Sequence, residues 1–441
     1  MHRTGARLST KLSKFVFLFT HGKIIRKMEN IMTNKQASEK AMKLEDQYGA
    51  HNYHPIPVVL ERGEGVFLWD VEGKQYFDFL SAYSAVNQGH CHPKIVRALT
   101  EQAQKLALTS RAFYNDCLGE YEKFVTAFFG YRKLLPMNTG AEGVETALKL
   151  ARRWGYEKKG IPANEAKIIV CKGNFHGRTI TAVSLSSDPE SYGNFGPPTP
   201  GFIKIDYNDV NALEDVLKKE KNVAGFLLEP VQGEAGVVVP DEGYLKKCYE
   251  LCKKHNVLFI ADEIQSGLGR TGKRICCDHE NVRPDILILG KALSGGLYPI
   301  SAVLADDEVM LTIKPGQHGS TYGGNPIAAK VGIAALTVLQ EENMFENSER
   351  LGKILLSELN KIKEERADLV TEVRGKGLFA AMVIKEREGK GAWQVCMKLM
   401  ERGLLAKPTH DDIIRFAPPL IITEDQLMVC LSIVRRVIKD F

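Results

Sequence analysis

The sequence contains no apolar run long enough to cross a membrane. A helix that spans a bilayer needs about 18 or more consecutive apolar residues, whereas the longest run near the beginning, Phe15 to Phe19, is far shorter. We therefore expect no membrane span. Of the 441 residues, 44% are hydrophobic and 26% are charged, which is typical of a globular chain with a substantial core and more than one domain.

Cysteine is scarce and follows no periodic framework. Nine cysteines in a chain of this length predict reduced thiols in an intracellular compartment. Cys248 and Cys252 lie one helical turn apart, but no second pair nearby completes a zinc site. The run 90–92 (His-Cys-His) lacks a third ligand at matching spacing, so the sequence predicts no metal.

The main part of the chain also lacks an excess of either charge. Residues 1–32 hold seven basic residues and one acidic residue, which leaves 52 basic and 53 acidic residues in the remainder. This balance argues against nucleic acid as a partner. The basic, hydroxyl-rich beginning is typical of a transit peptide and predicts the mitochondrial matrix, with the cytoplasm as the alternative. A start at Met28 or Met32, or a disordered basic tail, would also explain it.

Short apolar runs alternate with helical patterns through the middle of the chain. Two early runs, 66–70 and 75–80, flank a turn and predict a hairpin. The later alternation predicts an α/β domain with a mostly parallel central sheet covered by helices. The predicted strands are 166–171, 202–205, 223–229, 257–262, 286–289 and 300–305, and the predicted helices are 141–154, 211–220 and 244–255.

After Pro326 the pattern changes to longer helices with few strands, which predicts a smaller α+β domain. The expected helices are 328–340, 348–366 and 391–402, and the expected strands are 378–384 and 413–417. We therefore divide the chain into a basic leader (1–36), an N-terminal segment that packs with the small domain (37–85), a large α/β domain (86–338) and a small α+β domain (339–441).

Lys291 follows the apolar run 285–290 and precedes Gly295-Gly296, where a buried strand should break. Partial burial lowers the pKa of an ammonium group, and the neutral amine is the form that attacks a carbonyl carbon. Lys291 is therefore a candidate Schiff-base lysine. The alternative is a solvated lysine at a strand end, so the assignment depends on whether other residues supply what an aldehyde cofactor needs.

The turn at 136–140 leads into the helix predicted at 141–154, and Thr139 is positioned to cap that helix. The backbone N–H groups of Gly140 and Ala141 would point out of the helix start, where a phosphate can bind. An ordinary capped helix is the alternative. A second glycine-rich stretch, 316–325, can offer backbone donors and the Thr321 hydroxyl to an anion, and the predicted site includes the neighbouring Ser320.

Asp262 ends an apolar run, so its carboxylate must pair with a donor or a cation once it is buried. It precedes Lys291 by 29 residues, which leaves room for one excursion between two strands of the same sheet. Both residues would then face the rim where open α/β sheets bind ligands. In a pyridoxal phosphate site, an ionised Asp262 would keep the pyridine nitrogen protonated. A capped strand end is the alternative.

Three further residues follow predicted strands. Phe175 can stack on a planar ring, and Arg178 can form a forked pair with a carboxylate. Glu234 follows the strand predicted at 223–229. Each residue is weak evidence alone, but together with Asp262 and Lys291 they form a convergent set at one rim.

In order and spacing, five motifs resemble those of the class-III, fold-type-I pyridoxal phosphate aminotransferases. This resemblance implies a homodimer with its active site at the subunit interface, where Thr321 reaches the phosphate bound by the neighbouring chain. It also implies that Lys291 forms the imine with pyridoxal 5'-phosphate and that Asp262 contacts the pyridine nitrogen. Phe175 would lie on the ring face and Gln265 near the ring hydroxyl. The motifs are NTGAE (138–142), NFHGRT (174–179), EPVQGE (229–234), DEIQSGLGRTG (262–272) and GKALSGG (290–296).

Four further motifs are GAHNYHP (49–55), SAYSAVNQGHCHP (81–93), GLLAKPTH (403–410) and DIIRFAPP (412–419). Together they resemble the branch of this family that acts on ornithine. The resemblance implies that Tyr53 and Arg178 hold the α-amino acid head of ornithine, with Tyr83 also in the substrate site, so that the δ-amine faces the cofactor. Glu234 would pair with Arg415 while ornithine is bound and would release it to the α-carboxylate of 2-oxoglutarate. A fixed salt bridge is the alternative.

The predicted activity is therefore transfer of the δ-amino group of ornithine to 2-oxoglutarate, which gives glutamate 5-semialdehyde and glutamate. Another ω-aminotransferase on the same fold, acting on acetylornithine or 4-aminobutyrate, is the nearest alternative. A pyridoxal phosphate decarboxylase and a non-catalytic dimeric binding protein are the others.

Overall fold

The computed structural model describes residues 37–441 and divides into two compact units. The described part of the first unit comprises residues 37–63 and 67–76, and the second unit comprises residues 64–66 and 77–441. The predicted leader lies outside the described residues. The domain boundaries predicted at residues 85 and 338 stay predictions.

The first unit contains a helix over residues 37–48 and most of the predicted hairpin. The hairpin strands are β1 (Leu60–Glu64), β2 (Phe67–Asp70) and β3 (Gln75–Asp78), paired in that order, and Glu64, Phe77 and Asp78 at their ends belong to the second unit. The carboxylate of Asp70 is buried at the turn between β2 and β3. It accepts hydrogen bonds from the Lys74 N–H at 2.7 Å and from the Tyr76 hydroxyl at 2.6 Å, and these bonds fix the hairpin that the sequence predicts.

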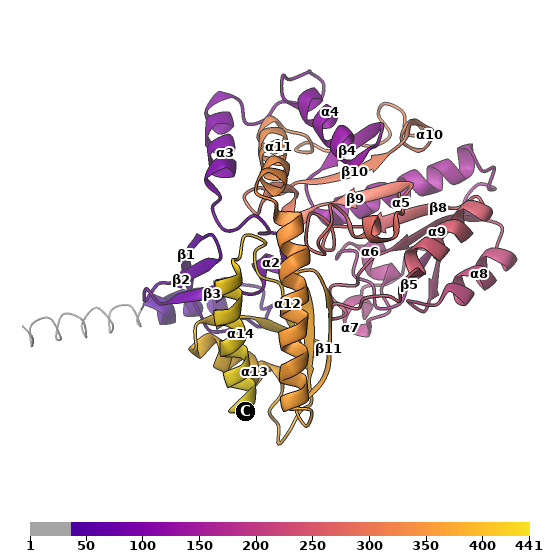
Figure 1. The fold of residues 1–441 in the computed structure, drawn as a ribbon. Coiled ribbons are helices and arrows are strands. Elements are labelled where there is room, and N and C mark those ends of the chain that lie inside the picture. Colours follow the sequence, from indigo (N-terminus) through magenta and orange to yellow (C-terminus); the bar gives the residue numbers. More distant parts are fainter. Residues whose placement is uncertain (1–36) are drawn as a thin grey trace, which may run out of the picture. The chain divides into compact units, whose positions relative to one another are not determined.

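The second unit is built around a seven-stranded sheet with the strand order β4, β10, β9, β8, β7, β5, β6 (Figure 1). The strands from β9 to β6 pair in parallel, whereas β10 runs antiparallel to both β9 and β4. The predicted, mostly parallel sheet is confirmed. Its strands are β4 (Lys133–Met137), β5 (Lys167–Cys171), β6 (Phe202–Ile205), β7 (Val223–Leu228), β8 (Leu258–Asp262), β9 (Ile286–Leu289) and β10 (Ser301–Ala305).

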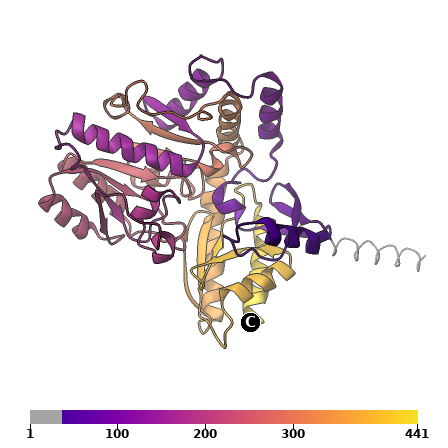
Figure 2. The ribbon, with the colours of Figure 1, turned by 180° about the vertical axis from the view of Figure 1, so that it is seen from behind.

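Helix α5 (Gly140–Glu157) covers one face of this sheet, and α8 (Val210–Lys219) and α9 (Tyr244–Lys254) cover the other (Figures 1 and 2). The chain crosses the sheet in one direction from β4 to β5 and in the opposite direction from β6 to β8. Because such connections are right-handed, the two directions place their helices on opposite faces. Val144, Leu148 and Ala151 of α5 join Ile260 and Ile288 of the sheet in the main core.

Several helices of the second unit surround this core or connect its strands. Most of them have no sequence-based prediction, although α11 corresponds to the helix expected at 328–340. They are α2 (Ser81–Ser84), α3 (Pro93–Lys105), α4 (Leu118–Phe129), α6 (Ile180–Leu185), α7 (Pro189–Tyr192), α10 (Asp307–Met310), α11 (Pro326–Glu341) and the 3-10 helices η1 (Cys276–Glu280) and η2 (Lys291–Ser294).

The C-terminal part of the second unit forms a four-stranded antiparallel sheet in the order β11, β12, β15, β14, with three helices beside it (Figure 1). The sequence predicts α12, β12, α13 and β15 but not β11, β13, β14 or α14. Strand β13 lies outside this sheet and pairs in parallel with the end of β3, where Leu404 meets Phe77. The elements are α12 (Met344–Glu365), β11 (Val370–Lys376), β12 (Phe379–Ile384), α13 (Ala392–Glu401), β13 (Leu404–Leu405), β14 (Lys407–Thr409), β15 (Ile413–Phe416) and α14 (Glu424–Lys439).

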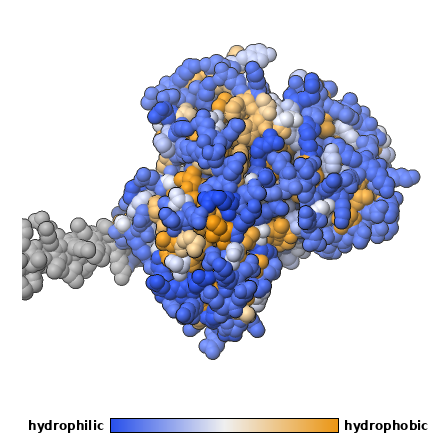
Figure 3. Space-filling view, in the orientation of Figure 1, coloured by the Kyte–Doolittle hydropathy of each residue, from blue (hydrophilic) through white to orange (hydrophobic). Residues whose placement is uncertain are grey.

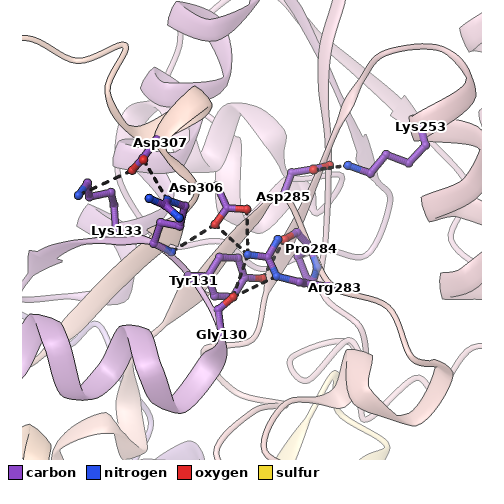
Figure 4. A network of polar contacts seen from close by, with 10 residues as sticks. Gly130, Tyr131, Lys133, Lys253, Arg283, Pro284, Asp285, Asp306 and Asp307 are labelled. Carbon is purple, nitrogen blue, oxygen red and sulfur yellow. Dashed lines mark hydrogen bonds and ion pairs between the residues drawn. The ribbon is translucent and has the colours of Figure 1, made fainter.

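Polar contacts join the ends of three strands of the large sheet (Figure 4). Arg283, which precedes β9, donates a hydrogen bond of 2.9 Å to Asp306, which follows β10. The guanidinium carbon of Arg283 lies 4.2 Å from the centre of the Tyr131 ring, and the Tyr131 hydroxyl donates to the Pro284 carbonyl at 2.8 Å. Tyr131 precedes β4, so this network links β4, β9 and β10 at the end of the sheet where the parallel strands begin.

The face drawn in Figure 3 is largely hydrophilic, with scattered apolar side chains. Most large apolar side chains are instead buried in the cores around the two sheets of the second unit. Among residues 37–441, no helix is both long enough and apolar enough to cross a membrane.

Candidate active site

A cavity of about 190 Å³ opens at the carboxyl ends of the parallel strands. Six of the residues that the sequence assigns to a cofactor line it, and they lie at or after the ends of four strands, β4, β5, β8 and β9. Four further residues, which the sequence does not assign, complete the wall. The predicted six are Gly140, Ala141, Phe175, Asp262, Gln265 and Lys291, and the other four are His176, Gly177, Glu229 and Ile264.

Lys291 begins the short helix η2 directly beyond β9. Its φ of 45° lies in the left-handed region, which is uncommon for a residue with a side chain. Burial lowers the pKa of Lys291, although the negative charges of Glu234, Asp262 and Glu229 oppose that shift. A lysine with a lowered pKa at this position supports the predicted role as a nucleophilic amine.

Asp262 ends β8 with its carboxylate buried beside His176. Its Oδ2 lies 2.7 Å from His176 Nδ1, and its Oδ1 accepts a hydrogen bond from the Ile264 N–H at 3.2 Å. Burial alone would lower the pKa of His176, but the bond to Asp262 and the charges of Asp262 and Glu229 raise it above its ordinary value. The Asp262 carboxylate therefore favours the positively charged form of His176.

Glu229 is a second buried carboxyl group at the same rim, one residue beyond β7. It accepts hydrogen bonds from the N–H groups of Phe175 at 2.8 Å and Gly233 at 3.2 Å. Burial raises the pKa of Glu229 to about 7, against the opposing charge of His176. The rule that identified Asp262, a carboxylate directly after a buried strand, would also have identified Glu229.

The start of α5 is organised as the sequence predicts. The Thr139 hydroxyl accepts a hydrogen bond from the Glu142 N–H at 3.2 Å, and the Glu142 carboxylate accepts one from the Thr139 N–H at 2.8 Å, so a complete capping box is present. The N–H groups of Gly140 and Ala141 precede the first intrahelical bond and can bind an anion. A Cβ atom at Gly140 would lie 2.9 Å from the Ile264 side chain, which favours glycine there.

Glu234 and Arg415 form an ion pair of 2.9 Å, although 181 residues separate them in the sequence. Burial would raise the pKa of Glu234, but the charge and hydrogen bond of Arg415 outweigh it and hold the pKa below its ordinary value. The guanidinium carbon of Arg415 also lies 5.0 Å from the centre of the Tyr83 ring. The structure thus brings together three of the predicted substrate residues.

Arg178 lies close to the cavity, with its guanidinium carbon 5.2 Å from the Phe175 ring centre and a hydrogen bond of 3.0 Å to the Ser191 hydroxyl. Ser320 and Thr321 do not line the cavity. The Ser320 hydroxyl instead accepts a bond of 3.0 Å from Asn138, and Thr321 is exposed. Tyr53 belongs to the first unit, and 70% of its surface is exposed.

The lining residues fit a phosphorylated pyridine aldehyde. The cavity offers an amine with a lowered pKa at Lys291, a buried carboxylate at Asp262 for a protonated ring nitrogen, an aromatic face at Phe175 and free N–H groups at the start of α5. His176 Nε2 is buried without a hydrogen-bond partner in residues 37–441, so the polar wall around Asp262 is incomplete in the protein alone.

Glu263, which follows Asp262 and is fully buried, should make the free energy of unfolding depend on pH. Burial raises the pKa of Glu263 to about 7 from an ordinary value of 4.5. A raised carboxyl pKa contributes stability that is complete below pH 4.5 and is lost as the pH rises through 7. The free energy of unfolding of Glu263→Gln, measured relative to the parent, should therefore rise by roughly 3 kcal/mol between pH 4.5 and pH 8.

Urea unfolding of both proteins at several pH values measures this difference. Glu101→Gln, which alters an exposed carboxyl group on α3, is the matched control and should show no such trend. A stability difference between Glu263→Gln and the parent that stays constant with pH would contradict the raised pKa of Glu263.

Known proteins are similar to this chain over most of its length. The sequence pattern described as aminotransferase class-III matches residues 48–438. The chain is 64% identical over 401 residues to ornithine aminotransferase, mitochondrial, from Drosophila melanogaster, which covers 91% of this chain and 92% of that protein. Relatives from several animals and plants are also named mitochondrial, whereas two from fungi are not.

Two solved structures are similar throughout. The ornithine aminotransferase of Toxoplasma gondii is 48% identical with a TM-score of 0.89, covering 91% of this chain and 95% of that one. The acetylornithine aminotransferase of Elizabethkingia anophelis is 61% identical with a TM-score of 0.84, covering 92% of this chain and 99% of that one. The two structures carry different substrate names, ornithine and acetylornithine.

Proposed function

Because the chain belongs to the class-III aminotransferase family, we propose that it transfers the δ-amino group of ornithine to 2-oxoglutarate. The products are glutamate and glutamate 5-semialdehyde, which cyclises to pyrroline-5-carboxylate. Members of this family use pyridoxal phosphate, and the chain is a pyridoxal phosphate-dependent aminotransferase. The observation that most directly supports ornithine is the Glu234–Arg415 ion pair beside the cavity.

Lys291 is the residue to which we assign the proton transfer. When bound, the cofactor withdraws electrons from the carbon that carries the substrate amine, which makes a proton on that carbon acidic. Lys291 Nζ would remove this proton as a general base and return it at another position as a general acid. Its lowered pKa suits both steps, because an amine that titrates closer to neutral pH can both accept and release a proton.

The other lining residues would hold the cofactor. Asp262, supported by His176, would keep the ring nitrogen protonated, and Phe175 would cover one ring face. Gly140 and Ala141 would donate their N–H groups to the phosphate. Gln265 is assigned to the ring hydroxyl.

The substrate residues solve a selection problem. One site must accept the terminal amine of ornithine and later a dicarboxylate. While Glu234 holds Arg415, the α-carboxylate of ornithine cannot use that guanidinium, so the head of ornithine binds at Tyr53 and Arg178 instead. When 2-oxoglutarate enters, Glu234 would release Arg415 to its α-carboxylate, and Arg178 would take the distal carboxylate.

We assign a second copy of this chain as the partner. Phe113, Tyr114 and Tyr322 are large aromatic side chains with more than half of their surface exposed, which is typical of a binding surface. Tyr322 follows Thr321, and a Cβ atom at Gly324 would lie 3.4 Å from the Arg111 guanidinium, so the two segments adjoin. Such a surface would let Thr321 and Ser320 reach the phosphate in the partner chain. Sedimentation of the holoenzyme tests the dimer.

For the location, we propose the mitochondrial matrix. The basic, hydroxyl-rich composition of residues 1–32 and the names of several animal and plant relatives support it. The mature N-terminus of native protein would decide between this location and the cytoplasm.

An assay with three amino donors tests the substrate. Ornithine should be used with a kcat/KM at least about tenfold above those of acetylornithine and 4-aminobutyrate, with 2-oxoglutarate as the acceptor. Acetylornithine is a pertinent rival because one similar structure bears that name. A preference for either rival donor would disprove the assignment, and release of carbon dioxide would indicate a decarboxylase.

A further inference from the structure

Helix α2 is a left-handed turn made without glycine. Its four residues, Ser81, Ala82, Tyr83 and Ser84, have φ angles of 48°, 46°, 60° and 67°, and Ala82 and Tyr83 have ψ angles of 50° and 46°. L-amino acids avoid this region because Cβ approaches the following carbonyl oxygen, and none of the four is Gly, Asn or Asp. Four such residues in succession persist only where the surrounding structure holds them.

Asp78 supplies the contacts that hold this turn. Its buried carboxylate accepts hydrogen bonds from the N–H groups of Leu80 and Ser81, both at 2.8 Å, through one oxygen. The other oxygen lies 2.7 Å from His90 Nε2. His90 is itself fixed, because its N–H and carbonyl both bond to Gly65.

The side chains of the turn contribute little to holding it. The hydroxyl groups of Ser81 and Ser84 are buried and have no hydrogen-bond partner among the described residues 37–441. Within the turn, the Ser81 carbonyl accepts from the N–H groups of Ala85 at 2.8 Å and Val86 at 3.1 Å. The side-chain cap at the start of the turn therefore comes from Asp78.

The handedness of the turn decides where Tyr83 points. Reversing the hand of a turn redirects the Cα–Cβ bonds of its residues, so a right-handed turn would carry the Tyr83 ring elsewhere. In the observed turn the centre of the Tyr83 ring lies 5.0 Å from the guanidinium carbon of Arg415. Arg415 also forms an ion pair of 2.9 Å with Glu234. The negative ring face attracts the guanidinium and adds to the pull of the carboxylate.

We propose that Asp78 is a positioning residue that determines which amine of ornithine reacts. It holds the left-handed turn, the turn holds Tyr83 against Arg415, and Tyr83 helps Glu234 keep Arg415 from the α-carboxylate of ornithine. This inference rests on the proposed function. Without Asp78, Arg415 becomes available to that carboxylate, and ornithine also binds in the reversed orientation, with its α-amine at the reaction centre.

The test is the product partition of ornithine in Asp78→Ala. Transfer of the δ-amine gives the 5-semialdehyde, whereas transfer of the α-amine gives the corresponding 5-amino-2-oxo acid, and the two products are separable. We expect the fraction of α-transfer to rise at least about tenfold, with a fall of about tenfold in kcat/KM for ornithine. Asp78→Asn keeps one side-chain oxygen for the turn and should give a smaller rise in α-transfer.

Asp70→Ala is the matched control. Asp70 is also a buried aspartate that caps a turn, but it holds the β2–β3 hairpin and has no assigned role in the site. Its product partition should equal that of the parent. An unchanged partition in Asp78→Ala would overturn the inference, as would an equal change in Asp70→Ala.

The asparagine variant decides the question if Asp78→Ala does not fold. A partition like that of the parent in folded Asp78→Asn would then overturn the inference. Failure of the proposed function is distinguishable, because it would appear as a parent enzyme that does not transfer the δ-amine of ornithine.

Discussion

Replacing Lys291 with alanine should abolish transamination, with a loss of turnover of at least ~10⁴-fold. Lys291 is the lysine of the cofactor cavity, and burial lowers its pKa. The variant loses both the amine that binds the cofactor aldehyde and the group that moves the substrate proton. The visible absorbance of the bound cofactor measures the first loss, and steady-state turnover with ornithine measures the second.

Two controls separate chemistry from folding in this experiment. Lys159→Ala removes another lysine whose pKa is lowered by burial, one that donates hydrogen bonds to the carbonyls of Val223 and His255, and this variant should keep most of its turnover. A small primary amine added to Lys291→Ala should restore part of the activity, because it supplies the missing base. Turnover by Lys291→Ala comparable to that of the parent would refute the proposed mechanism.

The second large effect concerns Arg270, which is fully buried and pairs with no carboxylate among residues 37–441. Its guanidinium donates to the carbonyls of Leu378 at 2.8 Å and Pro418 at 2.7 Å, and to the Asn87 side chain. Burial lowers the pKa of Arg270 despite the opposing charge of Asp78. The residue thus connects the loop after β8 with the C-terminal sheet and with the segment after α2.

Arg270→Ala should reduce the free energy of unfolding by at least ~3 kcal/mol, since it leaves three buried acceptors without donors and opens a cavity. Urea unfolding measures the loss. Arg274→Ala, which removes a half-exposed arginine from the same loop, should cost about 1 kcal/mol or less. A loss below ~1 kcal/mol in Arg270→Ala would show that the buried network contributes little.

The central strands of the large sheet were predictable because they are short runs of Ile, Val and Leu bounded by turn residues. Strand β4, Lys133–Met137, was not, because Pro136 argues against a strand. The structure accommodates it since β4 lies at the edge of the sheet. Helix α14 and strands β11, β13 and β14 were also missed, although the smaller α+β fold was expected.

The cofactor cavity was largely predictable because its residues follow strands whose ends must meet at one rim. The ion pair between Glu234 and Arg415 came only from resemblance, since no local pattern relates residues 181 positions apart. The left-handed turn at Ser81–Ser84 could not be predicted, because its residue types disfavour that conformation. Hydrogen bonds to Asp78, which is itself held by His90, impose it.

The contacts among Tyr131, Arg283 and Asp306 lie where the parallel strands begin, at the end of the sheet opposite the reacting groups (Figure 4). The large sheet therefore carries the reacting groups at one end of its strands and a stabilising polar network at the other end. Substitutions among these ion pairs should therefore change stability without changing the reaction. The same separation gives protein engineers a place to stabilise the enzyme at a distance from the substrate.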